Sequence, residues 1–303
     1  MDNEEQVEMV PKDIIKHIVI SGGGIIGFSH YGVLKESNKR GMWAIENIES
    51  IYGTSVGSLL AIFISLNFDW SVLDDYIIKR PWHNVINFTM YSIIQSIESR
   101  GILNIKIFEE IFEPLFLSKN IDINITLKEL YELTHIDIHI FATELNTFKL
   151  IDLSHADYQE WRVIDAVYAS CCVPLLFTPL IKDSCCYLDG GFLLNYPMSE
   201  CIRQGKNVNE IFGICQEMDK IHSLHIQEES TLFDYIFALL NKIVLNIFNV
   251  YTHEHLKYEI KINTVKMGLY AIFDFASSKD KRIEMIDLGV NQCIEYFDSI
   301  QQP

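Results

Sequence analysis

The sequence predicts an α/β fold, a three-layer α/β/α sandwich built on a mostly parallel central sheet. Two segments, residues 16–39 and 48–66, each read as a short apolar strand, a turn containing glycine and a helix. Strand and helix patterns go on alternating along the rest of the chain, which is typical of a parallel sheet covered by helices. With 303 residues, 49% hydrophobic and 21% charged, the chain is long enough for one large domain or two small ones.

The composition narrows the range of partners. A net charge of −17 argues against nucleic acid, because binding phosphates requires clustered basic side chains, and it weakens electrostatic attraction to anionic lipid. Residues 1–12 lack the apolar core of a signal peptide, and no uncharged span of 18 residues exists, so we expect a cytoplasmic protein without a transmembrane helix.

The seven cysteines form no C-x-x-C pattern. We expect their thiols to be reduced and most of them to pack in the interior.

A glycine loop separates the strand and the helix of the first unit. Residues 16–20 read as the strand and 28–39 as the helix, and the loop between them contains Gly22, Gly23, Gly24 and Gly27. The loop satisfies G-x-G-x-x-G, the fingerprint of a dinucleotide-binding turn, in which an acidic residue closes the second strand. Here Glu49 lies inside that strand instead. Bare N–H groups at a helix N-terminus, aimed at an oxyanion, explain the loop better.

The second unit contains the pattern of a nucleophile elbow. A strand ends at Tyr52, a helix begins at Val56, and Gly53-x-Ser55-x-Gly57 joins them. In such an elbow the serine occupies a strained corner, and glycines are needed because strand and helix cross too closely for side chains. The pattern is weak by itself, because a glycine-bounded turn with a capping serine has the same residues.

The middle of the chain predicts a helical insertion followed by a hairpin. Residues 69–134 are mostly helical by periodicity, with a capping box at 126–129, and residues 136–141 and 148–152 read as two strands. On the first strand one face carries His135, Asp137 and His139. We expect this to be a solvated strand face, with a metal site as the alternative.

A third candidate position follows the strand at residues 185–188. Asp189-Gly190-Gly191 places a carboxylate at the strand end and leaves the backbone after it free in its angles. Taken alone, the same residues describe an ordinary turn aspartate.

The remaining elements alternate between helix and strand, at 163–168, 211–217, 233–250, 269–275 and 277–299. In the 233–250 helix the polar residues are confined to one side, which leaves a wide apolar face. That face packs on the core in one interpretation and contacts lipid in the other. Its members include Phe237, Leu240, Val244 and Phe248.

Several blocks, taken in order, resemble the patatin-like phospholipase family. They are residues 22–27, 53–57, 141–147, 169–177 and 189–197. The first two look like the family's oxyanion loop and nucleophile elbow, at the family's spacing of about thirty residues. The next two are similar to internal structural blocks. The last, with Asn195 and Pro197, matches the block that carries the second catalytic residue.

The resemblance implies a catalytic dyad with no histidine, metal ion or cofactor. Ser55 would be the nucleophile, and Asp189 would be the base that takes its proton. An aspartate with an ordinary pKa near 3.9 is a poor base for a hydroxyl, so the site should be dry and preorganised. The supporting glycines would be Gly22, Gly23, Gly24 and Gly27 in the oxyanion loop, Gly53 and Gly57 in the elbow, and Gly190 and Gly191 in the loop after the base.

The glycine loop departs from the family pattern at two positions. Ile26 stands where the family commonly has a basic residue, and Ser21 stands where it often has aspartate. Because the oxyanion donors are backbone N–H groups, we expect the chemistry to survive and the orientation of the substrate to differ.

The implied function is hydrolysis of fatty-acyl esters of phospholipids, as in a calcium-independent phospholipase of the A type. A lysophospholipase, neutral lipase or transacylase on the same dyad is the alternative, and a non-catalytic lipid-binding homologue is the alternative of a different class. The implied partners are an acyl-lipid substrate and a transient membrane surface, with the protein peripheral to membranes. We expect a mobile tail at 1–15, a patatin-like catalytic domain at 16–205, and C-terminal elements at 206–303 packed on the same domain.

Overall fold

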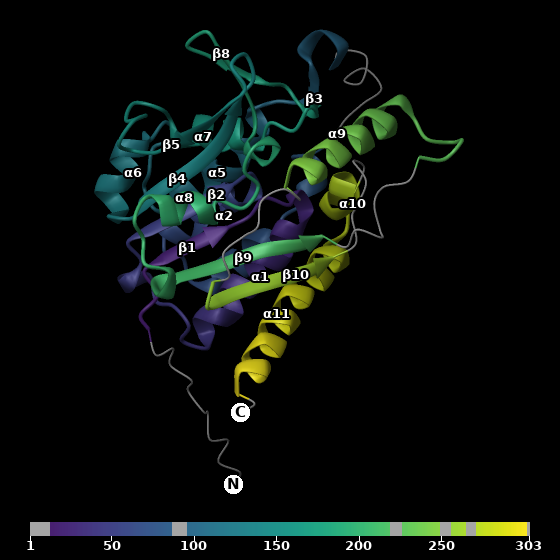
Figure 1. The fold of residues 1–303 in the computed structure, drawn as a ribbon. Coiled ribbons are helices and arrows are strands. Elements are labelled where there is room, and N and C mark those ends of the chain that lie inside the picture. Colours follow the sequence, from purple (N-terminus) through teal and green to yellow (C-terminus); the bar gives the residue numbers. More distant parts are fainter. Residues whose placement is uncertain (1–12, 87–95, 219–225, 249–255, 265–270, 302–303) are drawn as a thin grey trace.

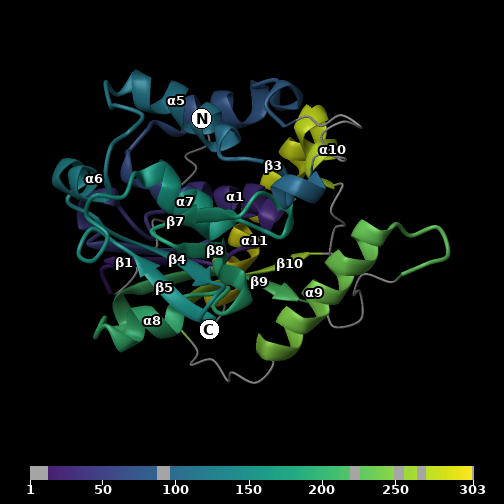
Figure 2. The ribbon, with the colours of Figure 1, turned by 90° about the horizontal axis from the view of Figure 1, so that it is seen from above.

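A central sheet of mostly parallel strands organises the protein, and helices cover it (Figures 1 and 2). The fold is that of a computed structural model, which describes residues 13–86, 96–218, 226–248, 256–264 and 271–301. The α/β/α sandwich with a mostly parallel sheet, expected from the sequence, is confirmed.

The sheet runs in the order β10-β9-β1-β2-β4-β8-β7, and β5 also pairs with β4. Its strands are β1 (His17–Ile20), β2 (Ser50–Thr54), β4 (Asp137–Glu144), β5 (Lys149–Leu153), β7 (Leu180–Lys182), β8 (Cys185–Asp189), β9 (Ile211–Met218) and β10 (Tyr258–Thr264). The pairs from β10 to β4 are parallel, whereas β5 and β8 run antiparallel to β4 and β7 runs antiparallel to β8. The segments that follow β1 and β2 therefore leave the sheet at the same edge.

Two further strands and ten helices complete the described elements that we use. β3 (Gly101–Leu103) and β6 (Leu175–Phe177) form a separate two-stranded sheet. The helices are α1 (Gly27–Lys39), α2 (Val56–Ser65), α3 (Trp70–Asp74), α5 (Lys106–Ser118), α6 (Leu127–Thr134), α7 (Val163–Cys171), α8 (Met198–Arg203), α9 (Leu232–Phe248), α10 (Ala271–Ser277) and α11 (Lys279–Gln301). The predicted capping box of α6 is confirmed, because Thr126 and Glu129 cap each other's backbone N–H groups.

Alternate residues of β1 face two separate hydrophobic clusters. Ile18 and Ile20 belong to the larger cluster, whereas Val19 belongs to a smaller one that includes Met198 and Cys201 of α8. This is the period of two expected for a strand that is covered on both faces. The two clusters are the interfaces between the three layers.

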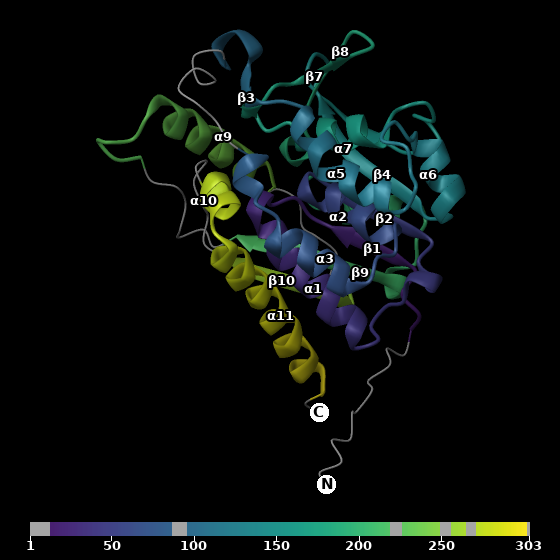
Figure 3. The ribbon, with the colours of Figure 1, turned by 180° about the vertical axis from the view of Figure 1, so that it is seen from behind.

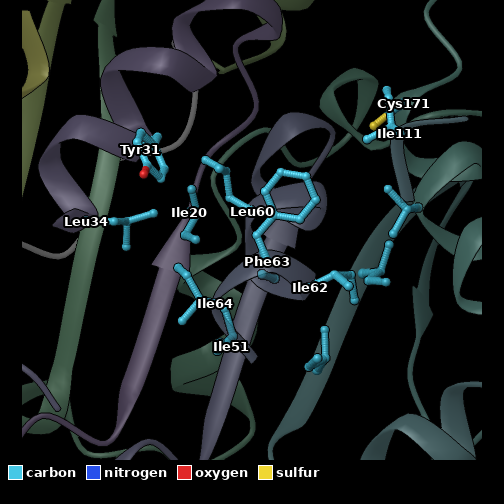
Figure 4. Packing of buried hydrophobic residues seen from close by; sticks show 14 of the residues in the cluster. Ile20, Tyr31, Leu34, Ile51, Leu60, Ile62, Phe63, Ile64, Ile111 and Cys171 are labelled. Carbon is cyan, nitrogen blue, oxygen red and sulfur yellow. The ribbon is translucent and has the colours of Figure 1, made fainter. Parts of the chain in front are cut away.

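Helices α1, α2 and α11 cover the face that holds the larger cluster. Figure 4 shows Ile20 and Ile51 of the strands beside Leu60 and Ile64 of α2, and all four belong to that cluster. Burial of each such side chain stabilises the fold by about 1.5–3 kcal/mol. Figure 3 shows α11 running along α1, where the Ser29 hydroxyl donates a hydrogen bond of 2.7 Å to the Met285 carbonyl.

The last strand predicted from the sequence is wrong. The sequence predicts a strand at residues 269–275. Residues 271–275 belong instead to helix α10 (Ala271–Ser277), and residues 269 and 270 lie outside the described part of the chain. A short continuous apolar run does not distinguish a buried strand from a buried helix. In the described part of the chain the last strand is β10, which the sequence did not predict although Tyr258, Ile260 and Ile262 alternate with polar residues along it.

The solvated face predicted on β4 is also wrong for one of its three members. His139 is buried, and its ring nitrogens lie 2.7 Å from an oxygen of Asp152 and 3.1 Å from an oxygen of Asp137. Burial opposes a charge on this ring, but the two carboxylates outweigh burial and raise the pKa of His139 to about 9. A buried imidazolium held between carboxylates therefore replaces the expected solvent contact, while His135 is exposed.

The C-terminal third continues the same sheet, because β9 pairs with β1 and β10 pairs with β9. The proposed division into a tail at 1–15, a domain at 16–205 and packed elements at 206–303 stays a prediction. Among the residues that the structure describes, no helix is both long enough and apolar enough to cross a membrane.

Candidate active site

The turn predicted to be a nucleophile elbow, residues 53–57, lies between β2 and α2. Ser55 has φ 53° and ψ −126°, a backbone conformation that residues other than glycine rarely adopt. A Cβ atom on Gly57 would lie 2.3 Å from the Ile20 carbonyl oxygen, and one on Gly53 would lie 2.6 Å from the backbone of Gly57. Both glycines are therefore needed for the close crossing of strand and helix, which forces Ser55 into the strained corner.

Ser55 and Asp189 meet although 134 positions separate them in the sequence. The Ser55 hydroxyl donates a hydrogen bond of 2.6 Å to Oδ2 of Asp189, at the end of β8. The other carboxylate oxygen, Oδ1, accepts a hydrogen bond of 2.7 Å from the backbone N–H of Gly191. Gly190 lets this loop approach β4, because a Cβ atom there would lie 2.1 Å from the Phe141 carbonyl oxygen.

The pair is nearly closed off from solvent, with 7% of Ser55 and 5% of Asp189 exposed. Burial raises the pKa of Asp189 to about 6, although the hydrogen bonds from Ser55 and Gly191 act in the opposite direction. The carboxylate is thus a stronger base than an ordinary aspartate and is still mostly ionised at neutral pH. This agrees with the dry site that the sequence required of an aspartate base.

The four loop glycines are not equivalent, and two of them, Gly22 and Gly27, lie against the residues of the elbow, Ser55 and Val56. The N–H of Gly22 donates a hydrogen bond of 2.9 Å to the Asn195 carbonyl. Gly27 lies at the start of α1, where a Cβ atom would lie 2.2 Å from a methyl carbon of Val56. Among the described residues, the N–H groups of Gly23 and Gly24 have no acceptor. Gly24 has φ +57°, the left-handed region that favours glycine.

Two neighbours of the site, Asn195 and Cys171, have surroundings that the sequence does not reveal. Asn195 packs between the loops, since a Cβ atom on Gly22 would lie 2.5 Å from its side-chain oxygen and one on Gly191 would lie 3.1 Å from it. Cys171 is buried near Ser55 and Asp189, and burial raises the pKa of its thiol well above the usual value. Their positions in two family blocks were the available signal.

The two departures from the family's glycine loop have different surroundings. Ile26 is buried and belongs to the larger hydrophobic cluster. The hydroxyl of Ser21 donates a hydrogen bond of 3.0 Å to the Gly22 carbonyl and accepts one of 3.3 Å from the N–H of Gln216. Neither position brings an ionised side chain to the loop.

The dinucleotide alternative finds no support in the position of Glu49. This carboxylate precedes β2 and lies 3.3 Å from the ammonium group of Lys16, which precedes β1. It is therefore at the amino ends of the strands, whereas the glycine loop follows their carboxyl ends.

Within the described ranges, no three histidine, cysteine or acidic side chains are grouped so that they could hold a metal ion.

A comparison with protein families decides the assignment. The family model for patatin-like phospholipase matches residues 18–202, which include the glycine loop, the elbow and the Asp189 loop. The chain belongs to the patatin-like phospholipase family. The blocks that suggested this patatin-like family from the sequence all lie within the matched region.

Known proteins agree with membership of the patatin-like family. Protein R571 of Acanthamoeba polyphaga mimivirus is 26% identical over 185 residues, which cover 61% of each chain. A probable lipid hydrolase, 463L of Invertebrate iridescent virus 6, is 22% identical over 198 residues, which cover 64% of this chain and 66% of the relative. The chain thus spans less than two thirds of the length of either relative.

A solved structure shares the fold. VipD from Legionella pneumophila superposes with a TM-score of 0.56 at 16% sequence identity, and the match covers 95% of this chain and 67% of VipD. At this identity the likeness concerns the arrangement of the elements only.

Proposed function

We propose that the protein is a lipid acyl hydrolase that cleaves fatty-acyl esters of phospholipids, with Ser55 as the nucleophile and Asp189 as the base. The observation that carries this proposal is the 2.6 Å hydrogen bond between two buried side chains, Ser55 Oγ and Asp189 Oδ2, beside a glycine loop with free N–H groups. Membership of the patatin-like family and the relative named a probable lipid hydrolase support the choice of a lipid ester.

In the first half of the reaction, Ser55 Oγ attacks the carbonyl carbon of the ester. Its proton passes along the existing hydrogen bond to Asp189 Oδ2, and the carbonyl oxygen becomes an oxyanion. The N–H groups of Gly23 and Gly24 are the available donors for this charge. When the tetrahedral intermediate collapses, the bond to the leaving alcohol breaks, and the alcohol takes the proton from Asp189.

In the second half, water attacks the acyl-serine ester and gives a proton to Asp189. The second tetrahedral intermediate uses the same oxyanion donors. Its collapse releases the fatty acid and returns the proton to Ser55 Oγ, so the site is restored. The same carboxylate accepts a proton and gives it back in each half of the reaction. A pKa near the working pH suits both transfers, and the pKa of about 6 for Asp189 is close to it.

A screen of products tests the substrate class. The purified protein would be incubated with vesicles of mixed phospholipids, lysophospholipids and neutral lipids, and the products would be identified by mass spectrometry. We expect free fatty acid and lysophospholipid from the wild type. Products from lysophospholipid or neutral lipid alone would favour the lysophospholipase or lipase alternative, acyl transfer to an alcohol would favour the transacylase, and no product at all would favour the lipid-binding homologue.

The pKa of Asp189 predicts the acid limb of the pH profile. A protonated Asp189 cannot accept the Ser55 proton, so kcat/KM should fall about tenfold per pH unit below pH 6 and level off above it. The measurement uses a soluble short-chain ester, whose availability does not change with pH. A limb that disappears when a histidine is replaced by alanine would assign the titrating base to that histidine instead.

Activity should persist in excess chelator. The sequence contains no calcium-loop pattern, and the proposed mechanism holds the oxyanion with backbone N–H groups. Fatty-acid release would be compared with and without EDTA on the same vesicles. Loss of activity in EDTA that calcium restores would contradict the calcium-independent proposal.

For the membrane surface, α9 offers an exposed apolar stripe. Phe237 packs partly against the core and Ala238 is buried, whereas Leu232, Tyr235 and Leu239 are exposed at 70%, 53% and 46%. The face of α9 that carries Phe237 therefore packs against the core, one of the two interpretations offered from the sequence. The side chains of Val244 and Phe248 lie outside the described part of α9.

We infer that this exposed stripe docks on an uncharged lipid surface. Figures 1 and 2 show α9 beyond the carboxyl ends of β9 and β10, the sheet edge at which β2 also leads into Ser55. An apolar stripe at that edge can touch the bilayer from which the ester must be drawn. The net charge of −17 opposes electrostatic attraction to anionic head groups, which favours an uncharged lipid surface.

Replacing Leu232 and Leu239 together by serine should weaken binding to phosphatidylcholine vesicles about tenfold or more, because each buried apolar side chain contributes about 1.5–3 kcal/mol. Vesicle flotation measures binding, which should depend little on salt, and hydrolysis of a soluble ester should be unchanged. The control is Leu133→Ser, since Leu133 is 54% exposed on α6 and lines a groove at the amino ends of the strands. Equal loss in the control, or no loss in the double variant, would contradict docking through α9.

A further inference from the structure

The C-terminal turn of α7 contacts the backbone of both members of the dyad. The hydroxyl oxygen of Ser170 accepts a hydrogen bond of 2.8 Å from the N–H of Ser55. Two residues further on, the carbonyl of Cys172 accepts one of 3.0 Å from the N–H of Asp189. One turn of helix thus holds the nucleophile and the base at their peptide groups.

The Ser170 hydroxyl also reaches β4. It donates a hydrogen bond of 2.5 Å to the Phe141 carbonyl oxygen, the atom against which Gly190 packs. The hydroxyl therefore connects the elbow to β4, at the carbonyl oxygen against which the loop after Asp189 packs. Ser170 is fully buried, so water does not compete for these bonds.

The elbow needs such a contact because Ser55 is held in a strained conformation. On its carbonyl side α2 supplies the restraint, since the Ser55 carbonyl accepts bonds from the N–H and the hydroxyl of Ser58. On its amide side the restraint is Ser170. A strained backbone persists only where its surroundings fix it, and here two helices do so from opposite sides.

From these contacts we infer that Ser170 is a positioning residue for the dyad. Its hydroxyl fixes the Ser55 peptide against β4 and thereby sets the geometry of the bond between Ser55 Oγ and Asp189 Oδ2. The inference rests on the proposed function, because it assumes that this bond carries the proton. Both the donor and the acceptor capacity of the Ser170 hydroxyl are engaged with backbone atoms, so the group acts through Ser55 and not on the substrate.

The chain offers a matched control in Ser37 of α1. Its hydroxyl is also fully buried, accepts a hydrogen bond of 3.0 Å from the Trp43 indole, and donates one of 3.1 Å to the Leu34 carbonyl. Ser37→Ala and Ser170→Ala each remove one buried hydroxyl with one donor and one acceptor. They should lower the melting temperature by similar amounts.

Only Ser170→Ala should change the chemistry. We expect kcat for a soluble short-chain ester to fall about 10- to 100-fold with little change in KM, since a small misplacement of a reacting group costs this much in rate. Labelling of Ser55 by a fluorophosphonate should slow by a similar factor. Ser170→Cys, whose thiol is a weaker donor and acceptor, should lie between alanine and the wild type, and it keeps the test open if the alanine variant does not fold.

The pH profile gives a second readout that a purely structural role would not move. The hydrogen bond from Ser55 lowers the pKa of Asp189, so loosening that bond should shift the acid limb of kcat/KM to higher pH. The limb should shift in Ser170→Ala and stay in place in Ser37→Ala.

Three outcomes would overturn the inference. One is a folded Ser170→Ala or Ser170→Cys variant with wild-type kcat and an unshifted acid limb, while Ser55→Ala is inactive. In that case the proposed function stands and the role of Ser170 is refuted. Another is an equal loss of kcat in Ser37→Ala, which would assign the effect to stability. The last is full activity in Ser55→Ala, which would refute the proposed function and the inference with it.

Discussion

Replacing Ser55 by alanine should reduce ester hydrolysis to background, a loss on the order of 10⁴- to 10⁶-fold. Without Oγ no acyl-enzyme forms, and the glycine loop has no tetrahedral intermediate to stabilise. The fold should survive, because alanine removes only the hydroxyl that donates to Asp189. Fatty-acid release by mass spectrometry and labelling with an active-serine fluorophosphonate measure the effect.

The matched control for this variant is Ser65→Ala at the far end of α2. The Ser65 hydroxyl is buried and donates 2.9 Å to the Ile62 carbonyl within the same helix. This variant should keep wild-type activity and labelling. Labelling of Ser55→Ala at the wild-type level would place the nucleophile elsewhere in the chain.

Replacing Asp189 by asparagine should cost on the order of a thousandfold or more in kcat. The amide has nearly the same shape and can hydrogen-bond to Ser55 Oγ, but it cannot take up the proton that attack releases. Members of a dyad act as a unit, so the loss should approach that of Ser55→Ala, and the double variant should be no worse than the single ones. The measurement is kcat for a soluble short-chain ester.

Asp183→Asn controls for the loss of an acidic side chain from the same hairpin. Asp183 is exposed in the turn between β7 and β8, at φ 51°, which asparagine adopts readily. It represents the ordinary turn aspartate that the sequence pattern of Asp189 also allowed. If a folded His→Ala variant lost as much activity as Asp189→Asn, a triad would replace the dyad.

Local sequence patterns predict the separate segments of this site better than they predict the contact between those segments in space. The elbow around Ser55 follows from glycine spacing, because backbone crossing admits no other residue at Gly57. Asp189 by itself carries no such signal. Its contact with Ser55 depends on the pairing of β8 with β4, and only the order of several family blocks pointed to it.

The misassigned elements share one cause: a short stretch of sequence does not show which other segments pack against it. The apolar run of α10 would suit either a helix or a strand, and its neighbours select the helix. His139 alternates correctly for a solvated face, yet the carboxylates of β4 and β5 surround it. The role inferred for Ser170 likewise depends on the Phe141 carbonyl, a backbone atom that no residue type reveals.

The burial of Asp189 also gives this one residue a pH-dependent effect on the stability of the fold, which is more favourable in acid. Its pKa is about 6 in the folded state against 3.8 for a free side chain, so between these values the folded protein holds a proton that the unfolded chain has released. The contribution of Asp189 to the free energy of unfolding should therefore decrease by about 3 kcal/mol in total as the pH rises from well below the lower value to well above the higher one, at 1.36 kcal/mol per pKa unit. Well above pH 6 the carboxylate is charged, so the form of Asp189 that the proposed mechanism requires is the form whose burial opposes folding.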